Sequence, residues 1–238
     1  QDKIEGSEAK VGSTQDGREN MTFLAVCPDK RHFISVSDKK NIFVFGVKGE
    51  VIPSESSPTK TKIPQAPTSC MFQKQPVGGK YRLWISCWGE ETNKAASIYA
   101  YDFDPQNPGK ELSKSFSLEG KHSTAVTDLS CFEDGKHLVS TGDDGKVIFW
   151  TLKQGEYEPQ EIDMRGKGEK AKTDCKYKCC KISPTSDEFI VGDDDGKIWV
   201  CTFISESEVE VWGSMRGHKE GFAGQVNCLS FLNEGCFV

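Results

Sequence analysis

One histidine, one serine and one aspartate lie close together near the middle of the chain. His122, Ser140 and Asp144 are the residue types of a hydrolase triad, in which a base activates a hydroxyl nucleophile. The serine, however, falls inside an apolar run and lacks the Gly-x-Ser-x-Gly elbow that exposes such a nucleophile. No pair of oxyanion donors can be identified, so the sequence favours a protein that is not an enzyme.

Two acidic turns raise the question of a metal site. Residues 142–145 read Gly-Asp-Asp-Gly, and residues 192–196 read Gly-Asp-Asp-Asp-Gly. A calcium loop needs oxygen ligands at alternate positions and a distal bidentate glutamate, and neither stretch has this spacing. Asp-Gly between two apolar runs is typical of a β-hairpin, because glycine tolerates the positive φ of the turn. We therefore expect hairpin turns, no metal and no cofactor.

Ten cysteines are a second set of potential metal ligands. Cys175, Cys179 and Cys180 form the densest group, but they lack the Cys-x2-Cys spacing of zinc sites and a second pair nearby. Most of the cysteines stand in apolar, strand-like runs, where a free thiol packs as a small hydrophobe. Since the sequence has no secretory segment, we expect free thiols in a reducing compartment and a core position for Cys180.

The segment 165–178, RGKGEKAKTDCKYK, is the one strongly basic stretch in a chain of net charge −6. It is interpreted either as a solvated loop or as a docking patch for an acidic protein or an RNA backbone. The candidate partner-binding residues are Arg165, Lys167, Lys170, Lys172 and Lys176. The acidic net charge argues against general binding of duplex DNA, so nucleic acid is the alternative partner and other proteins are the expected ones.

Short apolar runs between Gly, Asp, Asn, Pro and Ser clusters make up most of the chain, and helical periodicity is nearly absent. Three runs and a weaker fourth recur about every 50 residues, a period typical of propeller blades. The last core position of each third run falls at Phe45, Tyr101, Trp150 and Cys201. No apolar run is long enough to span a membrane, so we expect no membrane insertion.

Residues 122–150, HSTAVTDLSCFEDGKHLVSTGDDGKVIFW, resemble a WD repeat, and residues 217–235 repeat its opening as GHKEGFAGQVNCLSFLNEG. The resemblance to WD-repeat β-propellers covers about residues 20–238. It implies an all-β fold, a partial propeller of four complete blades plus the start of a fifth. After a flexible lead-in over residues 1–19, the blades are expected at about 20–60, 66–120, 122–165, 173–216 and 217–238, the last being truncated.

In WD repeats that this chain resembles, a histidine, a serine or threonine, an aspartate and a tryptophan form a buried hydrogen-bond network. The matching positions make up an expected structural tetrad: His122, Ser140, Asp144 and Trp150. A buried tryptophan needs an acceptor for its one N–H, and each remaining group can satisfy the next. The resemblance therefore implies that this set braces the third blade and carries no chemistry.

Four blades and part of a fifth form an open arc, whereas WD-repeat propellers usually close with about seven. An open arc leaves an unpaired edge and an uncovered blade face, which a stable protein avoids. We therefore expect the remainder of the propeller to come from residues beyond 238 or from another segment.

A propeller presents loops on a rigid frame and seldom carries its own chemistry, so the resemblance implies a non-enzymatic protein–protein interaction scaffold in a larger assembly. FIVGDDDGKIWV (189–200) and ISCWGEETNKAASIYAYDF (85–103) are similar to the echinoderm microtubule-associated-protein-like group and to axonemal multi-propeller proteins. This similarity implies tubulin or axonemal partners and a cytoplasmic location at the cytoskeleton or cilium. The alternatives are a ribonucleoprotein subunit that binds through 165–178, and a nuclear location.

Overall fold

The computed structural model describes residues 19–46, 61–89, 95–164, 175–185, 187–205, 208–216, 224–233 and 236–237. Every regular element within these ranges is a β-strand. Across the same ranges, no helix is long and apolar enough to cross a membrane. The expected lead-in lies outside the described residues except for Glu19.

Sixteen strands form four antiparallel sheets, and in each sheet four strands that follow one another in the chain pair in order. The strands of the first two sheets are β1 (Met21–Val26), β2 (His32–Ser37), β3 (Asn41–Gly46), β4 (Thr61–Lys62), β5 (Ala66–Phe72), β6 (Tyr81–Trp88), β7 (Ala96–Phe103) and β8 (Ser113–His122). Those of the third and fourth are β9 (Val126–Cys131), β10 (His137–Gly142), β11 (Val147–Lys153), β12 (Glu156–Glu161), β13 (Tyr177–Ile182), β14 (Glu188–Asp193), β15 (Lys197–Ser205) and β16 (Glu208–Arg216). A short hairpin follows, in which β17 (Phe231–Asn233) pairs with β18 (Cys236–Phe237).

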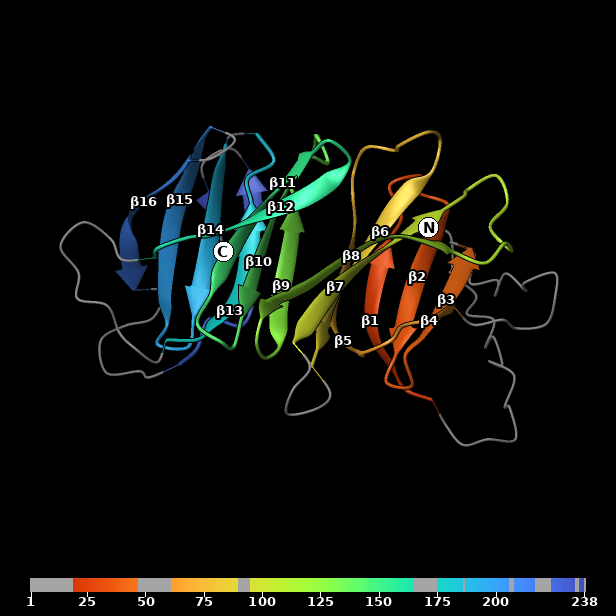
Figure 1. Ribbon diagram of the computed structural model, residues 1–238, viewed down its shortest axis with the longest axis horizontal. Helices are drawn as coiled ribbons and strands as arrows, with labels where there is room; N and C mark the ends of the chain where they lie inside the picture. The colour runs from red at the N-terminus through yellow and green to blue at the C-terminus, as the bar shows by residue number, and fades with distance from the viewer. Residues whose placement is uncertain are drawn as a thin grey trace, which may run out of the picture.

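The four sheets lie side by side in an open row, with β1–β4 at one end and β13–β16 at the other (Figure 1). The first strands of successive sheets, β1, β5, β9 and β13, contact one another and form the inner line of the row. The predicted all-β class is thereby confirmed, and the arrangement is that of propeller blades. The described residues form no closed ring.

The inner sheets are buried on both faces, because each sheet packs between two others. Leu138 and Val139 are adjacent in β10 and point to opposite faces, yet both are fully buried. Leu138 belongs to the apolar cluster shared with the second sheet, and Val139 belongs to the cluster shared with the fourth. Consecutive apolar residues in one strand are the sequence signature of a sheet that is covered on both sides.

The two acidic stretches form hairpin turns between the second and third strands of their sheets. Gly145 and Gly196 have φ values of 75° and 79°, the left-handed region that glycine enters without a steric penalty. The β10–β11 and β14–β15 pairs on either side of these turns are regular. The first sheet makes its corresponding turn with Lys40 at φ 66°.

Each inner strand contains a β-bulge at the same place, which the sequence pattern does not reveal. The register skips one residue in β1, β5, β9 and β13, and the skipped residues are Thr22, Thr68, Thr127 and Lys178. A bulge turns one side chain out of the regular alternation and increases the local twist. The four bulges therefore provide a common register along the inner line.

Two of the bulged threonines hydrogen-bond to the next sheet. Thr68 donates from its hydroxyl to the carbonyl oxygen of Val126 over 2.5 Å, and Thr127 donates to that of Tyr177 over 2.7 Å. Each acceptor is the residue that directly precedes the next bulge. The bulge thus repeats one side-chain link from sheet to sheet, whereas the hydroxyl of Thr22 bonds within its own sheet, to the Val36 carbonyl at 3.0 Å.

Asp128 joins three inner strands at once. Its carboxylate accepts a hydrogen bond from the Ser69 hydroxyl of β5 at 3.0 Å and one from the Cys180 amide of β13 at 3.1 Å. Burial raises the pKa of the Asp128 carboxyl in spite of these hydrogen bonds. The inner line is therefore held together by polar contacts between side chains and backbone as well as by apolar packing.

The segment after the fourth sheet lies along that sheet's remaining face. Val226 donates its amide to the Asp193 carbonyl at 2.9 Å, and Val226 and Leu229 pack against Cys179 and Ile190. The sequence pattern predicts a first strand over 225–232, but in the structure residues 224–230 form no strand and only Phe231–Asn233 does. Within the described residues, the partial fifth unit therefore covers the fourth sheet and forms only the two-stranded pair of β17 and β18.

Candidate functional site

The structure brings His122, Ser140, Asp144 and Trp150 into one chain of hydrogen bonds. The Trp150 indole donates to the Ser140 hydroxyl oxygen at 2.9 Å. The same oxygen lies 2.9 Å from His122 Nε2, and His122 Nδ1 lies 3.1 Å from Asp144 Oδ1. Asp144 also accepts the backbone amide of Ser123 at 2.8 Å. Each polar group in this buried chain therefore has a partner.

The direction of these hydrogen bonds follows from the donors available. An indole N–H can only donate and a carboxylate can only accept, so the Ser140 oxygen accepts from Trp150 and Asp144 accepts from His122 Nδ1. The Ser140 hydroxyl and His122 Nε2 share the remaining hydrogen bond. Ser140 is fully buried and its oxygen is engaged by both neighbours, so these residues do not present a nucleophile to a substrate.

His122 is the last residue of β8, so it belongs to the second sheet, whereas its partners stand on β10, β11 and the turn between them. The expectation of a brace inside one blade is therefore wrong in this respect, because the hydrogen bonds join two adjacent sheets. The difference arises because β8 runs on to His122 and pairs it with Ala96. The sequence repeat is thus offset by one strand from the sheet.

Gly142 makes room for the contact between His122 and Asp144. A Cβ atom at this position would collide with the Asp144 carboxylate and would lie 2.5 Å from His122 Nδ1. The requirement at Gly142 is therefore one of space, since its φ is not in the left-handed region.

The fourth sheet uses a different brace at the corresponding place. Asp193 occupies the register position of Gly142, and its carboxylate accepts the Trp199 indole N–H at 2.9 Å. The other carboxylate oxygen accepts the amides of Asp195 and Lys197 at 3.0 and 2.8 Å. The sequence analysis did not predict this contact between Asp193 and Trp199. The signal was the additional aspartate in Gly-Asp-Asp-Asp-Gly.

The carboxylates of the acidic turns are occupied by protein partners. Asp143 pairs with the Lys178 ammonium of the fourth sheet at 2.6 Å. Asp144 hydrogen-bonds to His122, and Asp193 accepts the Trp199 indole N–H. Within the described ranges, no group of three potential metal ligands comes together. Cys180 is buried in the core, and burial raises the pKa of its thiol well above the usual range.

Four of the five basic partner-binding candidates, Arg165, Lys167, Lys170 and Lys172, lie outside the described residues. Lys176 is described and exposed. Its amide donates to Asp194 Oδ1 at 3.1 Å, and its carbonyl accepts the Asp194 amide at 2.9 Å. These contacts fix the C-terminal end of the basic segment beside the β14–β15 hairpin, with the Lys176 side chain directed to solvent.

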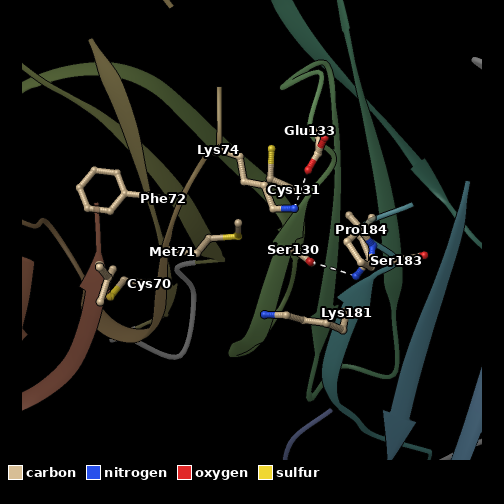
Figure 2. Close-up of a pocket in the computed structure, with 13 residues that line it drawn as sticks. Cys70, Met71, Phe72, Lys74, Ser130, Cys131, Glu133, Lys181, Ser183 and Pro184 are labelled. Carbon is tan, nitrogen blue, oxygen red and sulfur yellow. Dashed lines mark hydrogen bonds and ion pairs between the residues drawn. The ribbon is translucent and has the colours of Figure 1, made fainter. Parts of the chain in front are cut away.

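A pocket of about 310 Å³ lies where the inner strands end, and sequence analysis did not predict it. All four sheets contribute to its lining, the first of them through Ala25 and Val26. Figure 2 labels Met71, Cys131 and Lys181 from the other three sheets. It was missed because its lining residues are distant in sequence and share no motif.

Four antiparallel four-stranded sheets, packed face to face with their first strands adjacent, define a protein of the β-propeller class. The family model of the WD domain, G-beta repeat, matches residues 112–151, which supports the WD-repeat family. The matched segment runs from the start of β8 through most of β11, which is the same one-strand offset that places His122 in the preceding sheet. WD-repeat domains are typically interaction scaffolds without enzymatic activity. A comparison with curated proteins finds no match.

The Asp144 carboxylate makes the stability of this brace depend on pH. Burial acts to raise its pKa, but hydrogen bonds from His122 and from the Ser123 and Lys146 amides outweigh burial and hold the pKa below its usual value. A carboxyl with a lowered folded-state pKa stabilises the protein above its unfolded pKa of about 3.9, and this contribution is lost as the pH falls through the folded-state pKa.

We expect Asp144→Asn to reduce the free energy of unfolding by about 1–3 kcal/mol at pH 7, because it leaves buried partners unsatisfied. The difference from the wild type should narrow as the pH falls below about 4, where the unfolded-state carboxyl takes up protons, and through the lowered folded-state pKa of Asp144. Urea unfolding from pH 7 to pH 3 measures both quantities. The exposed Glu111→Gln is the control, expected within about 0.5 kcal/mol of wild type. If the difference in free energy of unfolding between Asp144→Asn and the wild type stayed constant from pH 7 to pH 3, this would contradict the role of the Asp144 carboxylate in the brace.

Proposed function

We propose that the chain is a non-enzymatic scaffold that binds other proteins within a larger assembly. The observation that carries this proposal is the outer face of the first sheet, defined by Leu24, Val26, Phe33, Phe43 and Phe45. Leu24 and Val26 are 60% and 62% exposed, and Phe33 and Phe45 stack with their ring centroids 4.9 Å apart. A contiguous apolar surface of this kind marks an interaction site.

Comparison with the other sheets supports a protein partner. Leu24 stands two residues after its bulge, as do Leu129 in the third sheet and Cys180 in the fourth. Leu129 and Cys180 are only 3% and 1% exposed, because the preceding sheet covers them. In the second sheet the corresponding Cys70 is half-buried and packs against the apolar cluster shared with the first sheet. The same register position is therefore covered, fully or in part, wherever a preceding sheet is present. A further β-sheet, supplied by the remainder of the propeller or by another chain, has the shape and polarity to cover the outer face of the first sheet.

The double substitution Leu24→Asn with Val26→Asn should lower the fluorescence of the apolar dye 8-anilinonaphthalene-1-sulfonate and reduce self-association of the chain. Both effects are expected because the outer face of the first sheet loses its two most exposed apolar side chains. The control is Val77→Asn, which replaces a half-exposed valine in the turn between β5 and β6. Titration with the dye and sedimentation velocity provide the measurements. Dye binding that falls equally in the control would contradict the proposal.

We propose further that the assembly is microtubule-associated, at the cytoskeleton or the cilium. The support is the basic segment 165–178, which is opposite in charge to the acidic tails of tubulin, together with the sequence similarity described above. Attraction between basic side chains and an acidic tail acts over a Debye length of about 10 Å at 0.1 M salt.

Co-sedimentation with microtubules tests this finer proposal. The wild type should sediment at low salt, and a variant with Lys167→Glu, Lys170→Glu and Lys172→Glu should remain largely in the supernatant. A matched variant with Lys30→Glu, Lys110→Glu and Lys121→Glu has the same net charge and should sediment like the wild type. Equal sedimentation of both variants would contradict a role for the basic segment. Salt-sensitive binding to RNA without binding to microtubules would favour the ribonucleoprotein alternative.

A further inference from the structure

The pocket at the ends of the inner strands has a defined position in the fold. Its lining comes from the last residues of β1, β5, β9 and β13 and from the turns that follow them (Figure 2). Its volume of about 310 Å³ is at the lower end of the range for ligand pockets. A cavity of this size suits one or two side chains rather than a large cofactor.

One register position contributes a different residue from each sheet. Ala25, Met71, Ser130 and Lys181 each stand three residues after the bulge of their strand, and all four line the pocket. Along this row the side chains change from apolar to a hydroxyl and then to an ammonium. The pocket is therefore apolar at one side and cationic at the other.

Lys181 provides the positive charge of this pocket. Lys74, the other lysine of the lining, forms an ion pair with Glu133 at 2.6 Å. The Lys181 side chain is exposed and forms no hydrogen bond or close ion pair with the described residues, although its charge interacts with the Asp128 carboxylate. The carboxylate of Asp128 is buried and already accepts hydrogen bonds from neighbouring strands. Figure 2 shows the Lys181 side chain extending from β13 toward the side that carries Met71, away from the Lys74–Glu133 pair.

The rest of the lining supplies one further donor and an apolar wall. The Ser130 hydroxyl oxygen accepts the Ile182 amide at 3.2 Å, which leaves its O–H free to donate into the pocket. Met71, Phe72 and Pro184 contribute apolar surface. An ammonium and a hydroxyl donor beside apolar groups match a carboxylate carried next to an apolar side chain. A phosphate chain fits less well, because Lys181 is the single cation that has no protein carboxylate partner in the described lining.

We propose that this pocket binds an acidic peptide segment, with a glutamate or aspartate carboxylate at Lys181 Nζ and an adjacent apolar side chain against Met71 and Phe72. The pocket shares Val26 with the outer face of the first sheet, but the residues proposed to hold the peptide, Lys181, Met71 and Phe72, lie outside that face and outside the basic segment 165–178. The proposal therefore does not depend on a partner at either place.

Fluorescence anisotropy with a short capped peptide of alternating glutamate and leucine, labelled with fluorescein, tests the proposal on the full chain. The wild type should bind this peptide and should bind the matched glutamine–leucine peptide much more weakly. Lys181→Met should lower the affinity about tenfold, as expected for loss of one charge-assisted hydrogen bond. Lys181→Arg should retain most of it. Lys110→Met, which removes an exposed lysine outside the pocket, should bind like the wild type.

Three results would overturn the proposal. The first is the absence of measurable binding of the glutamate peptide to the wild type at millimolar concentration. The second is equal binding of the glutamate and glutamine peptides. The third is an affinity that Lys181→Met leaves unchanged or that Lys110→Met reduces equally. Circular dichroism of each variant shows whether the sheet structure is retained, and Lys181→Arg keeps the test decisive if Lys181→Met does not fold.

Discussion

The burial of each inner sheet between two neighbouring sheets is the constraint on which this structure depends. A β-sheet that is apolar on both faces cannot stand alone in water, because each face loses about 25 cal/mol for every Å² of apolar surface left exposed. In β10, Leu138 and Val139 point to opposite faces of the sheet and both are buried. In β1, Leu24 is 60% exposed, because no described sheet covers its face. The interaction surface that we propose is thus the same packing surface without its neighbour.

Hydrogen bonds between sheets fix the positions of the sheets relative to one another. Thr68, Thr127 and Asp128 reach from one inner strand to the next, and the chain from Trp150 to His122 joins the second and third sheets. Apolar contact alone would tolerate sliding between sheets, whereas hydrogen bonds to particular backbone groups set one register. The fourth sheet replaces the histidine link with the Asp193–Trp199 contact. One sheet position can therefore hold different braces, provided that every buried polar group is paired.

Strands and turns could be predicted from the sequence because their signals are local. Period-two and fully apolar runs identify the strands, and the Asp-Gly pairs before Lys146 and Lys197 identify two hairpins. The four tetrad residues were recognisable from a sequence motif, but the membership of His122 in the second sheet was not, because it depends on how far β8 extends. Asp128 and the pocket around Lys181 were also beyond reach, since their partners come from strands that are distant in sequence.

The central claim is that bulged threonines stabilise the fold by linking one sheet to the next, and a pair of matched variants tests it most directly. Thr127→Val removes a hydroxyl that bonds both to the Tyr177 carbonyl in the next sheet and to Thr141 in its own sheet, whereas Thr22→Val removes one that bonds only within its own sheet. Urea unfolding should show a loss of about 1–3 kcal/mol for Thr127→Val and about 0.5 kcal/mol or less for Thr22→Val. Equal losses for the two variants would contradict the account.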